Sequence, residues 1–245
     1  MFSLSEQQLL SIWEIGLRQH PVERALTMLA VAFPEVSQDR LIALSVGQRD
    51  AYLLDIYERT FGSQLAGYAN CQQCQVQLEC TFDTATIRVG AASIDTTGQA
   101  WHMLIDGYEL STRLPDSSDL LAIKQCQSVA EARELLIERC ILSAFRNGDT
   151  ITREALPETV ITTLAEQMVE RDPQAEVLVA LSCPACAHDW EAVFDIVTFL
   201  WSEILTHAKR LLRQVHTLAA AYGWRESDIL AMSTARRQFY LEIVS

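Results

Sequence analysis

The fold of this chain depends on two short stretches, Cys71-Gln-Gln-Cys74 and Cys183-Pro-Ala-Cys186. Each stretch begins the same longer pattern, C-x2-C-x4-E-x2-F-D, and every residue of the second copy lies 112 positions after its counterpart. Self-similarity of this kind predicts a small internal repeat, made of two copies of one β-hairpin. The residues that complete the pattern are Glu79, Phe82, Asp83, Glu191, Phe194 and Asp195.

Cysteines at this spacing are typical of a structural zinc site. Two thiolates three residues apart on a tight turn can bind one Zn²⁺ side by side, and two such turns complete a tetrahedral coordination. A closed four-cysteine site is structural, because it leaves no position for water or substrate. The alternatives are a redox C-x-x-C pair, which usually opens a helix after a strand, or a disulfide. We predict one structural Zn²⁺ bound by Cys71, Cys74, Cys183 and Cys186.

Alternating apolar residues flank the cysteines and predict the strands of each hairpin. Around the second pair, apolar side chains recur at every second position over 177–181 and 190–194. This period of two indicates half-buried strands and disfavours the redox alternative. Cys80 falls on the apolar face of its strand, where we expect a core residue, and His188 is a further candidate ligand. We rank both residues below the four paired cysteines.

Composition and charge limit the class of protein. The 245 residues are 49% hydrophobic and 21% charged, which is ordinary for a globular protein with a real core. Seven cysteines, an odd number, fit a reducing compartment better than a disulfide framework. The chain starts without the basic and apolar regions of a signal peptide, and no apolar run approaches the roughly 20 residues that span a membrane. We expect synthesis in the cytoplasm and no membrane span.

The net charge of −13 is unfavourable for binding the phosphates of a nucleic acid. The charge is also unevenly distributed along the chain. Residues 200–245 carry six Lys or Arg and four Asp or Glu, whereas residues 1–199 carry 13 and 28. A mild asymmetry of this kind fits a tail that meets an acidic surface.

Five segments follow from the pattern of helices and strands. Residues 1–63 are expected to form N-terminal helices, one of them opened by the capping box of Ser45 and Gln48. The two zinc-ribbon hairpins are expected at 64–85 and 176–195. Between them, residues 86–175 are expected to form an inserted subdomain of about three helices and one hairpin, which turns at Asp106-Gly107. The last segment, 196–245, is expected to hold a long helix and a C-terminal helical pair.

The long helix is predicted to start near Asp195 and end at Gly223, with a seam of apolar residues at heptad spacing. This seam has two open interpretations: it packs onto the protein's own helices, or it binds a partner as a coiled coil. Trp224 is expected to hold the last two helices against the long one. The predicted fold class is α+β, mainly helical, with a small antiparallel four-cysteine zinc ribbon and a long C-terminal heptad helix. The seam residues are Val197, Trp201, Ile204, Ala208, Leu211, Val215, Leu218 and Tyr222.

The common catalytic signatures are missing from the sequence. We find no P-loop, no G-x-G-x-x-G, no G-x-S-x-G and no H-E-x-x-H. We expect no catalytic residues and a protein that is not an enzyme. Two alternatives stay open, a C-x-x-C oxidoreductase and a zinc-ribbon protein that binds nucleic acid or has a regulatory role.

Three stretches resemble the T4-type baseplate family. They are the tail 215–241 around Tyr222-Gly223-Trp224, the stretch 194–204 with the C-P-x-C turn before it, and the helix 49–62 with the first C-x2-C pair after it. These small zinc-knuckle proteins are encoded with contractile phage tails and extracellular contractile injection systems, and they join or help assemble the baseplate hub. The chain departs from the family at Ala187, where glycine often follows the second cysteine.

The resemblance implies a structural component or assembly factor of the baseplate of a contractile tail-like particle. It implies other baseplate, hub or spike proteins as partners, with no small-molecule substrate and no nucleic acid. It also implies synthesis in the bacterial cytoplasm and possible incorporation into the particle.

Overall fold

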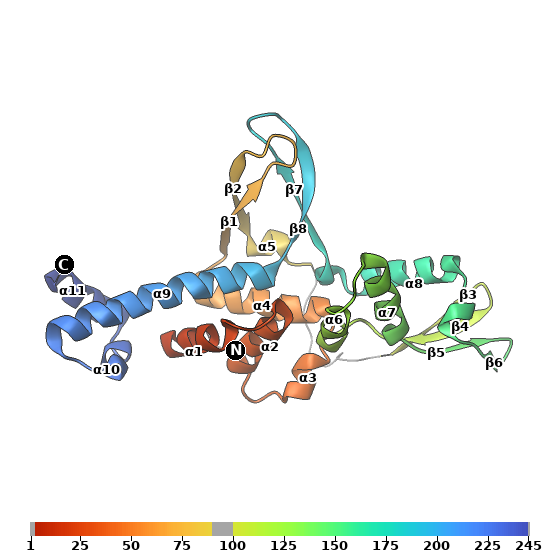
Figure 1. Ribbon diagram of the computed structural model, residues 1–245, viewed down its shortest axis with the longest axis horizontal. Coiled ribbons are helices and arrows are strands. Elements are labelled where there is room, and N and C mark those ends of the chain that lie inside the picture. The colour runs from red at the N-terminus through yellow and green to blue at the C-terminus, as the bar shows by residue number, and fades with distance from the viewer. Residues whose placement is uncertain (1–2, 90–99, 245) are drawn as a thin grey trace.

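The computed structural model describes residues 3–89 and 100–244 and is elongated (Figure 1). A helical body occupies its middle, and two β-hairpins rise together from one side of that body. A subdomain inserted between the hairpins forms one end of the molecule, and the C-terminal helices form the other. The chain is therefore α+β and mainly helical, as the sequence predicts.

The body is built from the N-terminal helices, three of which pack against the first half of the long helix α9. Capping boxes fix where three of them begin, and at two of these boxes Ser5 and Ser45 each accept a hydrogen bond from the backbone N–H three residues later. The apolar faces of these helices and of α9 enclose the largest core of the molecule. The elements are α1 (Glu6–Gly16), α2 (Pro21–Ala32), α3 (Gln38–Ile42), α4 (Val46–Phe61) and α9 (Ile196–Tyr222).

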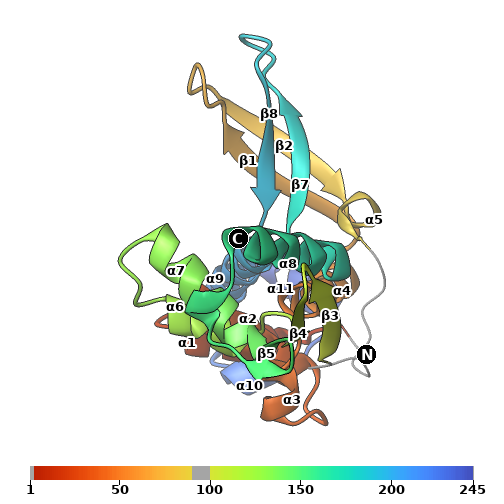
Figure 2. The ribbon, with the colours of Figure 1, turned by 90° about the vertical axis from the view of Figure 1, so that its right-hand side faces the viewer.

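Both hairpins of the repeat are present, and together they form the hairpin arm, residues 64–83 and 177–194. Each hairpin is an antiparallel pair of strands, and Figure 2 shows the two lying side by side with their turns at the free end of the arm. Asp195 accepts hydrogen bonds from the first N–H groups of α9, so the second hairpin leads directly into that helix. The strands are β1 (Gln64–Asn70), β2 (Gln77–Asp83), β7 (Val177–Ser182) and β8 (Asp189–Phe194).

The inserted subdomain, residues 100–171, contains one four-stranded sheet and has a core of its own. The predicted turn at Asp106-Gly107 is present, with positive φ at both residues. The chain passes directly from helix to strand at Ile141, and this strand turns at Asn147-Gly148, again with positive φ. Its elements are β3 (Trp101–Ile105), β4 (Tyr108–Thr112), α6 (Ser117–Ile123), α7 (Val129–Cys140), β5 (Ile141–Arg146), β6 (Asp149–Thr150) and α8 (Glu158–Arg171), whereas the short helix α5 (Thr84–Ile87) directly follows β2.

The insertion is tied to the body at the first turn of α4. The Asp172 carboxylate, just after α8, accepts hydrogen bonds from the Gly47 N–H at 2.9 Å and from the Ser45 hydroxyl at 3.0 Å. A second contact comes from the segment between β4 and α6, where the Pro115 carbonyl accepts a hydrogen bond from the Val46 N–H at 3.1 Å. Three consecutive residues, Ser45 and the first two residues of α4, thus hold segments that lie far away in the sequence.

The heptad seam of α9 is internal core. Six of its eight residues are buried, Trp201 is half-buried and Tyr222 is 36% exposed. The first half of the seam packs on the body, and the second half packs on α10 (Glu226–Leu230) and α11 (Thr234–Val244). The interpretation of the seam as a coiled coil with a partner is therefore wrong for this structure, since the chain itself covers it. Among the described residues, no helix has both the length and the apolarity to cross a bilayer.

The C-terminal arm, residues 209–244, is fastened to the opposite end of the chain. Arg237, only 1% exposed, forms an ion pair with Glu6 and donates a hydrogen bond to the Gln214 side chain at 2.9 Å. Trp224 stacks on Tyr222 with 4.4 Å between ring centroids, and it contacts Tyr240 edge-on. Trp224 thus packs between α9 and α11, as predicted, but it is only half-buried.

Candidate metal centre

The two C-x2-C turns face each other at the free end of the hairpin arm. The first turn joins β1 to β2 and the second joins β7 to β8. Each turn contributes one buried cysteine, Cys71 or Cys183, and one exposed cysteine, Cys74 or Cys186. The pairing in the arm therefore brings together four sulfur atoms from two turns that lie more than 100 residues apart in the sequence.

The backbone of the two turns is the same at equivalent positions. The Cys71 N–H donates to the Val76 carbonyl and the Cys183 N–H donates to the His188 carbonyl, both at 2.9 Å. The fourth residue after the first cysteine has a positive φ in each turn, +62° at Gln75 and +55° at Ala187. The internal repeat is thus one of local geometry as well as of sequence. It also shows why glycine suits position 187, because glycine adopts this conformation without a steric cost.

The sulfur positions fit a tetrahedral metal ion. Across the two turns, Sγ of Cys71 lies 3.6 Å from that of Cys186, and Sγ of Cys74 lies 3.6 Å from that of Cys183. All four ligand atoms lie within 4.8 Å of one another. Zinc–sulfur bonds of about 2.3 Å in a tetrahedron place sulfurs roughly 3.8 Å apart. The separations exceed the ~2.05 Å of a disulfide bond, so the four cysteines are free thiols that could hold a metal ion.

Backbone hydrogen bonds lower the pKa of the thiols, whereas the closeness of the other thiols raises it. The backbone N–H of Cys74 donates to the Cys71 sulfur and lowers the pKa of that thiol to about 6. The backbone N–H of His188 acts to lower the pKa of Cys186 too, but partial desolvation and the three neighbouring thiols outweigh it and raise that pKa to about 12. Like charges this close repel, so four thiolates together need a cation between them.

A small apolar cluster packs against the buried side of the site. Cys80 and Trp190 are half-buried and pack against Leu78 and the two buried cysteines. The ring of His188 stacks on Trp190 with 5.8 Å between centroids. Neither Cys80 nor His188 belongs to the group of sulfurs that lie within reach of one ion.

The remaining cysteines lie away from this centre. Cys140 is fully buried at the end of α7, and burial raises the pKa of its thiol to about 12, so it stays protonated. Helix α6 ends at Ile123, and Cys126 lies half-buried just after it. Within residues 3–89 and 100–244, no other set of three or more His, Cys, Asp or Glu side chains is placed to hold a metal ion.

The sequence indicated the four cysteines and the unusual residue Ala187, but not Gln75, which shapes the first turn in the same way. Gln75 and Ala187 occupy the same place in the repeat, and both carry positive φ. The signal was available in the sequence, because the offset that relates the cysteines also relates these two residues. A glutamine and an alanine are uncommon in this conformation, so composition alone did not reveal it.

Comparison with protein families decides where this arrangement belongs. Residues 2–201 match the family described as T4 bacteriophage base plate protein, and the match includes the body, both hairpins and the insertion. The chain belongs to the T4 baseplate family. Searches of curated proteins and of solved structures found no match.

Membership in the T4 baseplate family supports a structural role in a phage baseplate and contact with other baseplate proteins. The matched region contains all four clustered cysteines, so the candidate metal centre lies within the part shared with the family. The match ends at Trp201, and the C-terminal arm lies beyond it.

Proposed function

We propose that this protein is a structural component or assembly factor of the baseplate of a contractile tail-like particle, shaped by one structural Zn²⁺. The observation that carries the proposal is the group of four thiols, which unites two hairpins within a member of the T4 baseplate family. Thiolates are soft ligands, and a closed tetrahedral site of four sulfurs is a usual environment for zinc.

The metal would hold together two halves of the chain. Cys71 and Cys183 are separated by the whole insertion, and the long loop between them carries a large conformational freedom in the unfolded state. Because β1 follows α4 and β8 leads into α9, fixing the turns also fixes these two helices of the body. Binding of zinc by this site therefore stabilises the folded chain as a whole.

The site has the form of a structural centre rather than a catalytic one. With four protein ligands, a tetrahedral ion keeps no position for water or substrate. The protein would therefore act by contact, with other baseplate, hub or spike proteins as its partners. Both phage tails and contractile injection systems contain such an assembly, and either is compatible with this proposal.

Metal analysis of the purified protein tests the zinc site directly. We expect one Zn²⁺ per chain by mass spectrometry of the native protein and by elemental analysis. Cys186→Ser should lose the metal and lower the melting temperature, because three thiolates leave the coordination incomplete. Cys80→Ser and His188→Ala are matched controls in the same arm, and both should retain the metal. A metal-free native protein with Cys71 and Cys74 joined by a disulfide would favour the redox alternative.

Deletion of the gene tests the role in the baseplate. A strain that makes the particle should lose assembled baseplates on deletion and recover them with the wild-type gene, as seen by electron microscopy. Cys186→Ser should fail to restore them, whereas Cys80→Ser should succeed. Normal particles in the deletion strain would refute the baseplate role even if the protein binds zinc.

A further inference from the structure

We propose that the outer face of the second hairpin binds an extended, basic segment of a partner protein, in which Arg or Lys side chains follow apolar ones. The inference deepens the proposed function and rests on it for one point, that the partner is another baseplate protein. The outer face consists of the side chains of β7 and β8 that point away from the first hairpin, which are Leu178, Ala180, Ser182, Asp189, Glu191 and Val193.

The two faces of the second hairpin differ in what covers them. On the inner face, Val177 and Phe194 belong to the core of the body, and Trp190 packs against Leu78 of the first hairpin. All six side chains of the outer face are exposed. The inner face therefore holds the hairpin in place, and the outer face is free to contact another molecule.

An apolar pair occupies the end of the outer face that is nearest the body. Leu178 is 50% exposed and Val193 is 63% exposed, and the two lie directly opposite each other on β7 and β8. Directly opposed side chains in an antiparallel pair lie about 5 Å apart, so these two form one apolar surface. Apolar side chains of a partner would remove this surface from water, which favours binding.

Two carboxylates occupy the other end of the outer face, next to the cysteine turn. Glu191 lies opposite Ala180, and Asp189 lies opposite Ser182. Within the part of the chain that the structure describes, neither carboxylate takes part in a salt bridge. A long cationic side chain therefore finds two unpaired negative charges here. A hollow of about 340 Å³ lies at this end of the hairpin, lined by Ala180, Leu181, Ser182, Asp189, Trp190 and Glu191.

The internal repeat provides a comparison for this hollow. Glu79 of the first hairpin is the counterpart of Glu191, but it lies opposite Tyr68, whereas Glu191 lies opposite Ala180. Tyr68 and Ala180 are also counterparts in the repeat. On the first hairpin, a large ring thus occupies the place that Ala180 leaves open on the second.

The charge of the hairpin arm selects the kind of partner. The arm contains four acidic residues and no Lys or Arg, so it repels nucleic acids and anionic lipids. Asp189 and Glu191 alone supply too few ligands for a divalent cation such as Ca²⁺. A protein segment with both cationic and apolar side chains complements the carboxylates and the apolar pair together.

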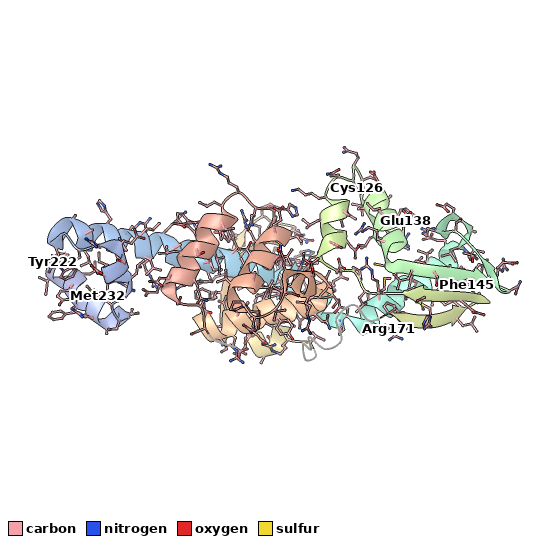
Figure 3. The ribbon with its side chains drawn as sticks, turned by 90° about the horizontal axis from the view of Figure 1, so that it is seen from below. Cys126, Glu138, Phe145, Arg171, Tyr222 and Met232 are labelled. Carbon is pink, nitrogen blue, oxygen red and sulfur yellow. The ribbon has the colours of Figure 1, made fainter. Side chains whose placement is uncertain are left out.

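The position of the arm makes its outer face accessible to a large partner. The arm rises from the middle of the molecule (Figure 1), whereas Figure 3 shows Phe145 and Arg171 of the insertion on one side of the body and Tyr222 and Met232 of the C-terminal arm on the other. The four steps from Leu178 to Ser182 span about 13 Å of strand. A segment of about five extended residues is therefore long enough to cover the apolar pair and reach the carboxylates.

A synthetic peptide serves as the probe in an NMR titration of the full-length, ¹⁵N-labelled protein. In an extended Val-Ser-Val-Ser-Arg-Ser-Arg peptide, the valines and arginines share one face. Its binding should shift the amide signals of β7 and β8, with a dissociation constant on the order of 100 µM to 1 mM. One control peptide has Ser in place of both Val, and the other has Glu in place of both Arg. Both control peptides should bind at least about fivefold more weakly.

Matched variants separate the outer face from the net charge of the protein. Glu191→Lys should weaken binding at least about fivefold, because it puts a positive charge beside the hollow. Glu79→Lys changes the net charge equally at the equivalent place on the first hairpin, and it should change binding by less than about twofold. Leu178→Ser should weaken binding about threefold. Its control is Val129→Ser, which should have no effect, because Val129 is 87% exposed but lies in the insertion.

Three results would overturn the inference. The first is a Val–Arg peptide that leaves the signals of β7 and β8 unshifted at millimolar concentration. The second is equal weakening by Glu191→Lys and Glu79→Lys, which would show attraction by net charge alone. The third is a wild-type protein that dimerises without peptide and loses the dimer on Glu191→Lys, which would place a second copy on this face. The titration needs no particle and no cysteine is changed, so failure here is distinguishable from failure of the baseplate role or of the zinc site.

Discussion

At the scale of single residues, each turn of the hairpin arm holds one residue in an unfavourable backbone conformation. Gln75 and Ala187 adopt the left-handed backbone conformation, which crowds the Cβ atom of an L-residue against the backbone. The same conformation lets the backbone turn back within five residues, so that the Cys183 N–H reaches the His188 carbonyl. The turn places the cysteines correctly, and the strain at these two residues is the consequence.

We predict that Ala187→Val lowers the free energy of unfolding of the metal-loaded protein by about 1–2 kcal/mol. A β-branched side chain tolerates positive φ poorly, and Ala187 is exposed, so loss of packing does not contribute. Ala185→Val in the same turn is the control, since Ala185 is exposed and its φ is not positive. Urea denaturation measures both variants, and equal effects would show that the conformation at 187 is not the cause.

At the scale of elements, α9 connects the parts of the molecule. It starts at the hairpin arm, crosses the body and ends in the C-terminal arm (Figure 1). Its buried face is continuous, with Leu200 and Ile204 in the body core and Leu218 in the core of the C-terminal arm. Gly223 ends the helix with φ of +68°, a conformation that glycine adopts readily.

We predict that Ala208→Asp prevents stable folding. Ala208 is fully buried beside Leu10 and Leu211, and an unpaired carboxylate there would cost several kcal/mol. Thr206→Asp is the control on the solvent side of α9 and should change stability by less than about 0.5 kcal/mol. Soluble yield and circular dichroism distinguish the two. A folded Ala208→Asp protein that fails only in binding a partner would revive the coiled-coil interpretation.

At the scale of the whole molecule, a buried carboxylate joins the insertion to the body. Asp172 is 8% exposed, and its oxygens accept hydrogen bonds from Gly47 and Ser45. The contact is close, because a Cβ atom at Gly47 would lie 2.2 Å from an Asp172 oxygen. Burial raises the pKa of Asp172 above its ordinary value, although these hydrogen bonds and the charge of Arg49 act to lower it.

We predict that this raised pKa makes stability depend on pH. The folded protein keeps a proton on Asp172 at a pH where the unfolded chain has lost it. This contribution to the free energy of unfolding therefore falls as pH rises from about 4 through the raised pKa. Asp172→Asn removes the titration, and its amide can still accept from the Gly47 N–H. Urea denaturation across this range should show a stability difference, wild type minus variant, that declines with rising pH. A difference that is constant with pH would contradict the raised pKa.

Much of this protein could be predicted from local sequence. The capping box at Ser45, the turn at Asp106-Gly107 and the helix between Asp195 and Gly223 all depend on residues close together in the chain, and the structure confirms each. The short strands after Ile141 were missed, because an apolar run of that length continues a helix as readily as it begins a strand.

The sequence by itself determined the repeat, and with it the identity of the clustered cysteines. The spacing of the cysteines, the alternation of apolar residues and the offset between the two copies can all be read from the sequence without knowledge of the fold. The tertiary structure alone decided that the heptad seam is buried and that Phe239 is exposed. Both are apolar helical positions in the sequence, and only the neighbours brought by distant segments distinguish them. Burial depends on which surfaces pack together, and that packing is determined by the whole chain rather than by neighbouring residues.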